Sequence, residues 1–311
     1  MGNAVLVTGG AGFIGSHLVD ALLAQGHAVR VVDNFSTGSR DNLAHCLARI
    51  SLLEGDVGDP DIALAACRDV EYVFHQAAIP SVPRSVKDPF STQRAGEIAT
   101  LRLLDACAAQ GVKRIMYAAS SSAYGDAPGL PRAETMPPAP MSPYAASKLA
   151  CEYYVRAYAH CRGLDGVCLR YFNIFGPRQD PDSPYSAVIA LFLKLMRQGQ
   201  APHIHGDGEQ TRDFTYVVNV VHANLLAMRV RGPLNGQAIN VGCGERSSLN
   251  ALVAALNDAL GTSLTPTYGP PRAGDVAHSL ADISRARELL GYVPRVPFPE
   301  GIRRLAAACP I

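Results

Sequence analysis

A glycine-rich segment between an apolar run and a helical pattern constrains this chain more than any other feature. In "VLVTGGAGFIGSH", the glycines Gly9, Gly12 and Gly15 recur at every third residue. Glycines at this spacing let the backbone amides of a turn approach a pyrophosphate, which the partial positive charge of the following helix N-terminus also attracts. The segment therefore predicts a strand, a phosphate-binding turn and a helix, in that order.

An acidic residue closes the second predicted strand. Asp33 ends "AVRVVD", 18 residues after Gly15. A carboxylate at this place can accept hydrogen bonds from the ribose hydroxyls of an adenosine, and it repels a 2′-phosphate. We therefore expect NAD rather than NADP as the cofactor, although Arg40 follows closely in the sequence.

Strand and helix patterns alternate along the first half of the chain. Short apolar runs predict strands at 4–7, 28–33, 50–56, 70–78, 113–120 and 165–173. Helical spacing of apolar residues predicts helices at 13–26, about 91–110 and 142–161. Strands that alternate with helices of this length predict an α/β fold with a doubly wound parallel sheet, which binds ligands outside the carboxyl ends of its strands.

The pattern loosens after residue 173. Turn-rich loops at 176–184 and 269–275 enclose helical patterns near 185–199, 216–230 and 249–260 and a strand at 238–242. We expect residues 1–173, with a returning segment at about 214–242, to form a Rossmann-type dinucleotide-binding domain. Residues 174–213 and 243–311 are expected to form a smaller α/β substrate lobe.

Composition and charge exclude several functional classes. The 311 residues carry a net charge of +1 with scattered Lys and Arg, so no basic stripe indicates a nucleic-acid partner. No apolar run reaches the ~20 residues of a membrane helix, and the pattern of a cleaved signal peptide is missing, so we expect a cytoplasmic protein without membrane association.

The eight cysteines form no Cys-x-x-Cys pair and are expected to be reduced. His203 and His205 alternate in an extended segment, which is more typical of a structural role than of a metal site, and we expect no metal.

A tyrosine and a lysine lie one helical turn apart in "SPYAASKLACEYY". Tyr144 and Lys148 are four residues apart, so their side chains share one face of the predicted helix. A cation fixed beside a phenol favours the phenolate and lowers the pKa of the tyrosine from about 10. Two neighbours on a surface helix would give the same spacing, so the pair alone does not establish chemistry.

The whole chain resembles the extended short-chain dehydrogenase/reductases, and within them the NAD-dependent UDP-sugar 4-epimerases. The resemblance rests on segments that follow one another in the family's order: "TGGAGFIG", "GDVGD", "HQAA", "SSSAYGD", "YAASK", "RYFNIFGPRQ", "GDGEQTRDFTYV" and "RAGDVAHSLAD". It implies that NAD is held by Gly9, Gly12, Phe13, Ile14, Gly15, Asp33, Asn34, Ser36, Gly38, Asp56, Val57, Ala77, Ala78, Tyr144, Lys148 and Tyr171.

The resemblance also implies a mechanism and its catalytic residues. Tyr144, as phenolate, would take the proton of the sugar C4 hydroxyl while C4 gives a hydride to NAD, and the hydride would return to the opposite face of a 4-keto sugar. Lys148 would bind the nicotinamide ribose and lower the pKa of Tyr144. Counting back four residues from Tyr124 selects Ser120 as the hydroxyl that donates to the sugar oxygen. Ser121 and Ser122 remain open as alternatives, because "SSSAYG" is shorter than the family's pattern.

The substrate implied by the resemblance is a UDP-sugar. Arg212 and Arg272 match positions that clamp the diphosphate. Ser279 matches a position on the wall of the sugar pocket, where a small residue leaves room for an acetamido group. We therefore expect UDP-N-acetylglucosamine and UDP-N-acetylgalactosamine as substrates, with UDP-glucose and UDP-galactose as further candidates and UDP-glucuronate as an open alternative. The substrate-binding candidates are Ser81, Ser121, Ser122, Asn173, Arg178, Gln179, His205, Arg212, Arg272, Asp275 and Ser279.

Other activities of the same family fit these residues less well. A dehydratase or decarboxylase would need an acid directly after the hydroxyl position, where this chain has Ser121 and Ser122. A reductase would depend on added cofactor, and a dinucleotide sensor would have lost the catalytic set that is intact here. The resemblance further implies a homodimer that pairs through the helices at about 91–110 and 144–161.

Overall fold

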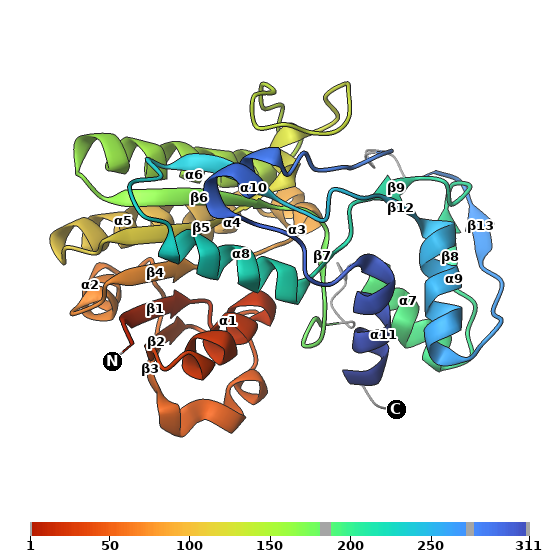
Figure 1. The fold of residues 1–311 in the computed structure, drawn as a ribbon, viewed down its shortest axis with the longest axis horizontal. Helices are drawn as coiled ribbons and strands as arrows, with labels where there is room; N and C mark the ends of the chain where they lie inside the picture. Colours follow the sequence, from red (N-terminus) through yellow and green to blue (C-terminus); the bar gives the residue numbers. More distant parts are fainter. Residues whose placement is uncertain (1, 181–187, 272–276, 309–311) are drawn as a thin grey trace.

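A seven-stranded sheet forms the centre of the molecule, and every neighbouring pair of its strands is parallel (Figure 1). The computed structural model describes residues 2–180, 188–271 and 277–308. From edge to edge the strands are β11 (Gln237–Val241), β6 (Asp165–Tyr171), β5 (Arg114–Ser120), β4 (Tyr72–His75), β1 (Ala4–Thr8), β2 (Ala28–Asp33) and β3 (Ile50–Glu54). The predicted doubly wound α/β fold is confirmed.

The strand order reverses at β1. The chain runs outward from β1 to β2 and β3 and then crosses to β4, which pairs with the other side of β1. Loops at the carboxyl ends of β1 and β4 therefore leave in opposite directions and open a crevice. Open α/β sheets bind their ligands at such a point.

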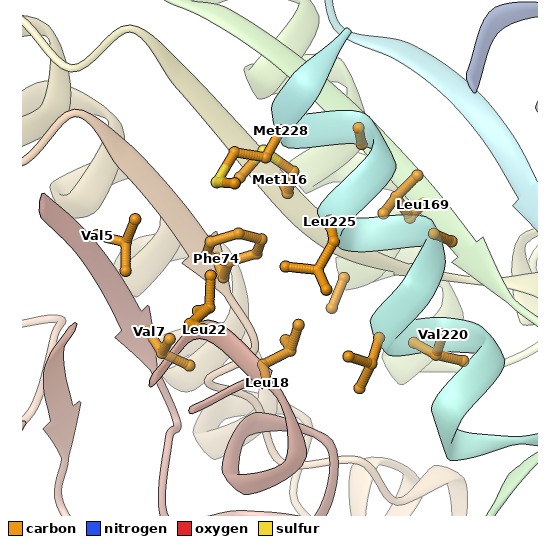
Figure 2. Close-up of a cluster of buried hydrophobic side chains, with 14 of the residues drawn as sticks. Val5, Val7, Leu18, Leu22, Phe74, Met116, Leu169, Val220, Leu225 and Met228 are labelled. Atoms are coloured by element: carbon orange, nitrogen blue, oxygen red, sulfur yellow. The ribbon is translucent and has the colours of Figure 1, made fainter. Parts of the chain in front are cut away.

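Helices cover both faces of the sheet. One face carries α1 (Phe13–Ala24), α8 (Val217–Arg229) and α10 (Ser284–Leu290), and the other carries α2 (Pro60–Cys67), α5 (Ala99–Ala109) and α6 (Pro143–Cys161). Figure 2 shows Leu22 of α1 and Leu225 of α8 beside Phe74 and Met116 of the sheet. Burying such a side chain contributes about 1.5–3 kcal/mol, so these two cores hold the strand ends in fixed positions.

The helix predicted at about 91–110 is built from three consecutive segments. They are α4 (Pro89–Gln93), a π-helical turn (Arg94–Ile98) and α5. Within the turn, a Cβ on Gly96 would collide with the Ser147 hydroxyl of α6, so this glycine lets the two helices pack closely. Single π-helical turns inside α-helices are often found at functional sites. The short helix α3 (Val82–Lys87) precedes them.

The rest of the chain forms a smaller lobe around a separate hydrophobic core. Its helices are α7 (Val188–Arg197), α9 (Leu249–Leu260) and α11 (Phe298–Ala308). Three two-stranded ladders join β7 (Ile174–Phe175) to β10 (Thr215–Tyr216), β9 (Thr211–Arg212) to β12 (Ser247–Ser248), and β8 (His203–His205) to β13 (Thr267–Gly269). Helix α10, although inside the range 243–311, packs on the first core through Ala286 and Leu290. The proposed domain boundaries stay a prediction.

Among the described residues, no helix combines the length and the apolar character needed to cross a membrane. The cysteines in this part of the chain are free, and all except Cys161 and Cys243 are buried.

Candidate active site

A cavity of about 1150 Å³ lies at the carboxyl ends of the central strands. It runs from the turn after β1 to the end of β6 and reaches the loop at 176–180. Residues predicted to bind the cofactor or to carry catalysis line it together: Gly9, Gly12, Phe13, Ile14, Gly15, Asp33, Asn34, Ser36, Gly38, Asp56, Val57, Ala77, Ala78, Ser120, Tyr144, Lys148 and Tyr171. The structure thus brings to one cleft residues that are spread along the sequence from Gly9 to Tyr171.

The glycine turn approaches its neighbours too closely for any side chain. Gly9 has a φ of +66°, and a Cβ there would lie 2.7 Å from the backbone nitrogen of Ala77. A Cβ on Gly15 would overlap the carbonyl oxygen of Gly9. Helix α1 starts directly behind, with Gly12 at its N-cap, and no side chain of the described residues caps its first amides. Free amides at a helix start, facing a cavity, suit the pyrophosphate of a dinucleotide.

Asp33 is buried at the end of β2. Its Oδ2 accepts a hydrogen bond from the backbone N–H of Ala11 over 2.8 Å, and its Oδ1 accepts one from the N–H of Phe35 over 2.8 Å. These bonds fix the carboxylate on the wall of the cavity, where it fits the ribose hydroxyls of an adenosine. Arg40, which left room for NADP, pairs with Glu54 over 2.6 Å and stacks on the Phe35 ring.

Helix α6 begins at the cavity and carries both Tyr144 and Lys148. Ser142 caps it by accepting a hydrogen bond from the N–H of Ala145, and Pro143 occupies its first position. The Nζ of Lys148 donates to the carbonyl oxygen of Ala118 in β5 over 2.7 Å and lies 5.0 Å from the centre of the Tyr117 ring. Burial lowers the pKa of Lys148 to about 8, although Cys151 and Glu152 raise it.

The expectation that Lys148 lowers the pKa of Tyr144 is wrong for this structure. Burial raises the pKa of Tyr144, and the hydrogen bond that lowers it comes from Ser120. The reason is that removing the phenol from water disfavours the phenolate, while the Lys148 ammonium is directed toward a carbonyl of the sheet. Four-residue spacing placed both side chains in one cleft, where burial and Ser120 set the direction of the Tyr144 pKa shift.

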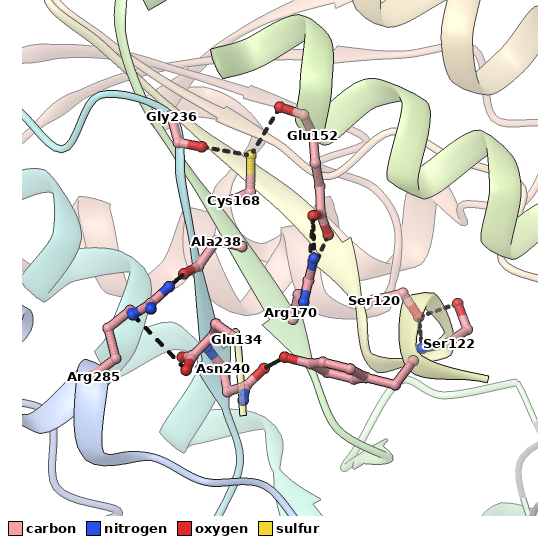
Figure 3. Close-up of polar contacts among 11 residues, drawn as sticks. Ser120, Ser122, Glu134, Glu152, Cys168, Arg170, Gly236, Ala238, Asn240 and Arg285 are labelled. Carbon is pink, nitrogen blue, oxygen red and sulfur yellow. Dashed lines mark hydrogen bonds and ion pairs between the residues drawn. The ribbon is translucent and has the colours of Figure 1, made fainter. Parts of the chain in front are cut away.

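The structure distinguishes the three consecutive serines by where they lie relative to the cavity. Ser120 ends β5 and lines the cavity, whereas Ser121 and Ser122 begin a 3₁₀ turn (Ser121–Tyr124) and are not among the described lining residues. The Ser120 Oγ accepts hydrogen bonds from the backbone N–H of Ser122 over 3.1 Å and from its hydroxyl over 2.8 Å (Figure 3). The Ser120 hydroxyl therefore remains able to donate its own proton toward the cavity, which favours it over its neighbours.

A buried histidine beneath the cavity escaped the sequence-based site prediction. The ring of His75, at the end of β4, lies between the hydroxyls of Thr8 (2.7 Å) and Thr100 (3.0 Å). Burial, and then the charge of Lys148, lower the pKa of His75 to about 3, so the ring is neutral. The signal was present in "HQAA", where the neighbouring Gln76 lines the cavity and hydrogen-bonds the Tyr171 hydroxyl.

The wall of the cavity toward the smaller lobe is polar. Asn173 lines it with a φ of +39°, and its Nδ2 donates weakly to the Ser279 Oγ over 3.4 Å. The Ser279 N–H donates to the carbonyl oxygen of Thr211 over 3.0 Å. Ser279 thus lies next to a cavity-lining residue. Ser81, the N-cap of α3, also lines this cavity.

The other substrate-binding candidates lie in several different places. Arg178 and Gln179 line the cavity, and Arg178 also pairs with Asp20 of α1 over 2.8 Å. The Arg212 Nη1 donates to the carbonyl oxygens of Thr211 and Ala277. His205 is exposed in β8, where its ring meets that of His203. Arg272 and Asp275 lie outside the described residues.

A buried aspartate ties together the loops around Arg212. The Asp213 carboxylate accepts hydrogen bonds from the backbone N–H groups of Cys243 (2.8 Å), Gly244 (3.0 Å) and Ala281 (3.1 Å). Burial raises the pKa of Asp213 to about 6 in spite of these donors. The segment "TRDF" predicts a phosphate-clamping role for Arg212, but its local pattern gives no sign that Asp213 anchors two distant loops.

Comparison with known proteins gives consistent matches over nearly the whole chain. A family model described as the NAD dependent epimerase/dehydratase family matches residues 5–242. The UDP-glucose 4-epimerase of Mycolicibacterium smegmatis is 41% identical over 304 residues, covering 96% of each chain.

Two solved structures extend the comparison to bound ligands. The UDP-N-acetylglucosamine 4-epimerase of Methanobrevibacter ruminantium, in complex with UDP-N-acetylmuramic acid, has a TM-score of 0.94 at 39% identity and covers 99% of this chain and 98% of its own. The UDP-glucuronic acid 4-epimerase of Bacillus cereus, in complex with NAD and a fluorinated UDP-sugar, has a TM-score of 0.90 at 32% identity and covers 98% of each chain.

Proposed function

The chain belongs to the NAD dependent epimerase/dehydratase family, and from that membership we propose that it interconverts UDP-N-acetylglucosamine and UDP-N-acetylgalactosamine. At the coarser level it is an isomerase, an NAD-dependent UDP-sugar 4-epimerase, as its relatives are. The observation that carries the proposal is the single cavity in which the glycine turn, Asp33, Ser120, Tyr144 and Lys148 meet.

The residues of the cavity fit NAD in shape and charge. The amides at the start of α1 would hold the pyrophosphate, Asp33 the adenosine ribose, and Lys148 the second ribose. NAD bound there would supply the chemistry of reversible hydride transfer, in which one proton and two electrons leave the sugar carbon together and later return to it.

The chain's own residues would move the proton. Tyr144 lies within hydrogen-bonding reach of Ser120, so the two can bracket the C4 oxygen of a sugar that enters the cavity. Tyr144 would accept the hydroxyl proton as C4 becomes a ketone and return it as C4 is reduced. Ser120 would donate to the same oxygen, and its hydrogen bond to the phenol lowers the pKa that burial raises.

The proposal of acetamido sugars rests on the small side chain of Ser279, which lies at the boundary of the two lobes. Ser279 is held beside Asn173 by its own backbone hydrogen bond to Thr211. A serine at this position leaves space that a large aromatic side chain would fill. UDP-glucose, UDP-galactose and UDP-glucuronate are the alternatives, because relatives that act on glucose and glucuronate sugars match the chain as well.

Direct turnover tests this proposal. The purified protein is incubated separately with UDP-N-acetylglucosamine, UDP-glucose and UDP-glucuronate, without added NAD, and the product mixture is read by chromatography at equilibrium. We expect conversion of the acetamido sugar to exceed that of the other two. Conversion of UDP-glucuronate alone would replace the proposed substrate, and turnover that requires stoichiometric added cofactor would contradict the epimerase itself.

We also propose that the protein pairs as a homodimer through α4–α5 and α6. Three large side chains on these elements, Phe90, Ile98 and Tyr153, are exposed in the single chain. Light scattering on Phe90→Glu should show a monomer, with Leu47→Glu, an exposed leucine on a different element, as the control. An unchanged mass for Phe90→Glu would refute this interface.

A further inference from the structure

The segment that carries Ser279 is held between two parts of the chain that lie far from it in sequence. On one side, the N–H of Ser279 donates to the carbonyl oxygen of Thr211 over 3.0 Å, and the N–H of Thr211 donates to that of Ala277 over 3.1 Å. On the other side, the N–H of Arg132 donates to the carbonyl oxygen of Leu280 over 2.8 Å. The wall proposed for the sugar pocket therefore depends on residues outside its own segment.

Asp213 joins this segment to the turn that follows β11. Its Oδ2 accepts hydrogen bonds from the backbone N–H groups of Ala281 (3.1 Å) and Gly244 (3.0 Å), and its Oδ1 accepts one from that of Cys243 (2.8 Å). Asp213 is fully buried, and a Cβ on Gly242 would lie 2.7 Å from its Oδ2. The carboxylate and the turn after β11 are thus closely fitted to each other.

The neighbours of Asp213 belong to the substrate wall of the cavity. Arg212, the proposed diphosphate clamp, precedes it, and the Arg212 Nη1 donates to the carbonyl oxygen of Ala277 over 3.2 Å. Asn173, which lines the cavity, donates from its Nδ2 to the Asp213 carbonyl oxygen over 3.3 Å and to the Ser279 Oγ over 3.4 Å. One buried residue therefore connects the proposed clamp, the proposed sugar wall and a lining residue of the cavity.

We propose that Asp213 is a positioning residue for the UDP-sugar, whose ionised carboxylate holds Arg212 and Ser279 in the arrangement that binds the ligand. This role rests on the proposed function, from which the tasks of Arg212 and Ser279 come. An ionised carboxylate can accept from three backbone N–H groups at once, whereas a protonated acid turns one of its oxygens into a donor. Protonation of Asp213 should therefore release at least one of the joined segments and weaken substrate binding.

Acid should reveal this role. Burial raises the pKa of Asp213 to about 6, although its backbone donors and the Thr215 hydroxyl lower it. Below that pH the ligand-free site takes up a proton that the binding-competent form lacks, so the affinity for the UDP-sugar falls as the pH falls through about 6.

Other titratable groups lie near this carboxylate. Cys243 and Tyr292 face it from neighbouring segments, and burial raises the pKa of both groups, so they stay neutral as the pH falls. The segments around Asp213 also carry Arg132, Arg212, Tyr216, Glu245, Arg246, His278 and Asp282. A variant that shifts the pKa of Asp213 is therefore needed to assign the titration.

The test measures binding. The full-length protein, loaded with NAD, is titrated with UDP-N-acetylglucosamine in a calorimeter at several pH values between about 7.5 and about 5. The diphosphate of this ligand is esterified at both ends and gains no proton in this range. We expect the wild-type dissociation constant to rise about tenfold at the lowest pH, because about one molecule in ten keeps an ionised carboxylate one pH unit below its pKa. The content of bound NAD should stay the same.

Variants assign the titration to Asp213. Thr215→Val removes a hydroxyl that donates to the Asp213 Oδ1 over 3.4 Å and lowers the pKa of Asp213, so the midpoint should move to higher pH. Asp213→Asn should bind about tenfold more weakly throughout, with little change between the two ends of the pH range. Asp165→Asn is the matched control, because Asp165 accepts from the N–H groups of Leu234 and Asn235 at the start of β6 and should leave the wild-type constants unchanged.

A wild-type dissociation constant that is equal at both ends of the pH range would overturn the proposal, and so would a midpoint that Thr215→Val leaves in place. Equal weakening by Asp213→Asn and Asp165→Asn would also overturn it, because both would then act through a general loss of structure. If Asp213→Asn does not fold, the wild-type and Thr215→Val titrations still decide. Binding with the expected pH dependence but without conversion of the sugar would contradict the proposed epimerase and support the positioning role.

Discussion

The Nζ of Lys148 donates a hydrogen bond to the carbonyl oxygen of Ala118 over 2.7 Å. This bond joins α6 to the carboxyl end of β5, two residues before Ser120. It orients the ammonium toward the sheet and gives this buried lysine a hydrogen-bond acceptor. The lysine is thus a fixed cation of the site, and its protonation should matter to function.

The pH dependence of catalysis should report this lysine. Because burial lowers the pKa of Lys148 to about 8, the ammonium is present below that pH and is lost as the pH rises through it. If the cation is needed, kcat/KM should fall on the alkaline side with a midpoint near 8, and Lys148→Arg, which keeps its charge, should move that limb upward. The measurement is a pH–rate profile of both proteins, and an unchanged alkaline limb in Lys148→Arg would assign the titration to another group.

Removing the phenol hydroxyl should separate catalysis from cofactor binding. Tyr144→Phe is expected to keep its NAD content, because the ring stays in place, while turnover falls by about 10²–10⁴-fold. Gly15→Ala should have the opposite effect on cofactor content. A Cβ at this position overlaps the Gly9 carbonyl, so this variant should lose its NAD. Bound NAD is measured after heat release and turnover by chromatography. A Tyr144→Phe protein with near-native turnover would remove this residue from the mechanism.

A large side chain at the lobe boundary should change substrate selection. Ser279→Tyr is expected to lower kcat/KM for UDP-N-acetylglucosamine by at least about tenfold, whereas kcat/KM for UDP-glucose should fall much less. The reason is that a poorer fit of one substrate group in a pocket changes the transition-state binding free energy by about 1–3 kcal/mol. Ser279→Ala, which keeps the space, serves as the control. Equal losses on both sugars would show that the tyrosine disturbs the lobe rather than the acetamido pocket.

His75 should make the fold sensitive to acid. Its pKa is lowered from 6.5 to about 3 in the folded protein, so below pH 6.5 the unfolded chain binds a proton that the native chain does not. This group therefore costs stability as the pH falls from 6.5 toward 3, by up to about 1.4 kcal/mol per pH unit. Urea unfolding at pH 7.0 and 5.5 should show wild type losing about 1 kcal/mol more than His75→Gln. An equal loss in both proteins would contradict the assignment.

The strands and the cofactor turn could be predicted from sequence because their signals are local. The run "AVRVVD" gives β2 at the predicted residues 28–33, and the predicted helix at 142–161 matches α6. The π-helical turn at 94–98 could not be foreseen, because it depends on the close fit of Gly96 against Ser147 in another helix.

The pKa shifts in the site were harder to predict than the identity of the residues that line it. Spacing correctly placed Tyr144 and Lys148 on one cleft, yet the pKa of the phenol depends on burial and on Ser120, which are properties of the folded surroundings. Asp213 was missed for a similar reason, since its three backbone donors come from residues that are distant in sequence.

The edge strand β11 has a consequence for how this protein can be made. Within the described part of the chain it pairs only with β6, from which it is separated by the segment that builds much of the smaller lobe. Until residue 241 has left the ribosome, β6 presents an open row of amides and carbonyls, which is a template for aggregation. A shortened gene that stops at residue 173 would therefore yield an insoluble fragment, and a cofactor-binding module could be cut from this chain only if β11 were carried along.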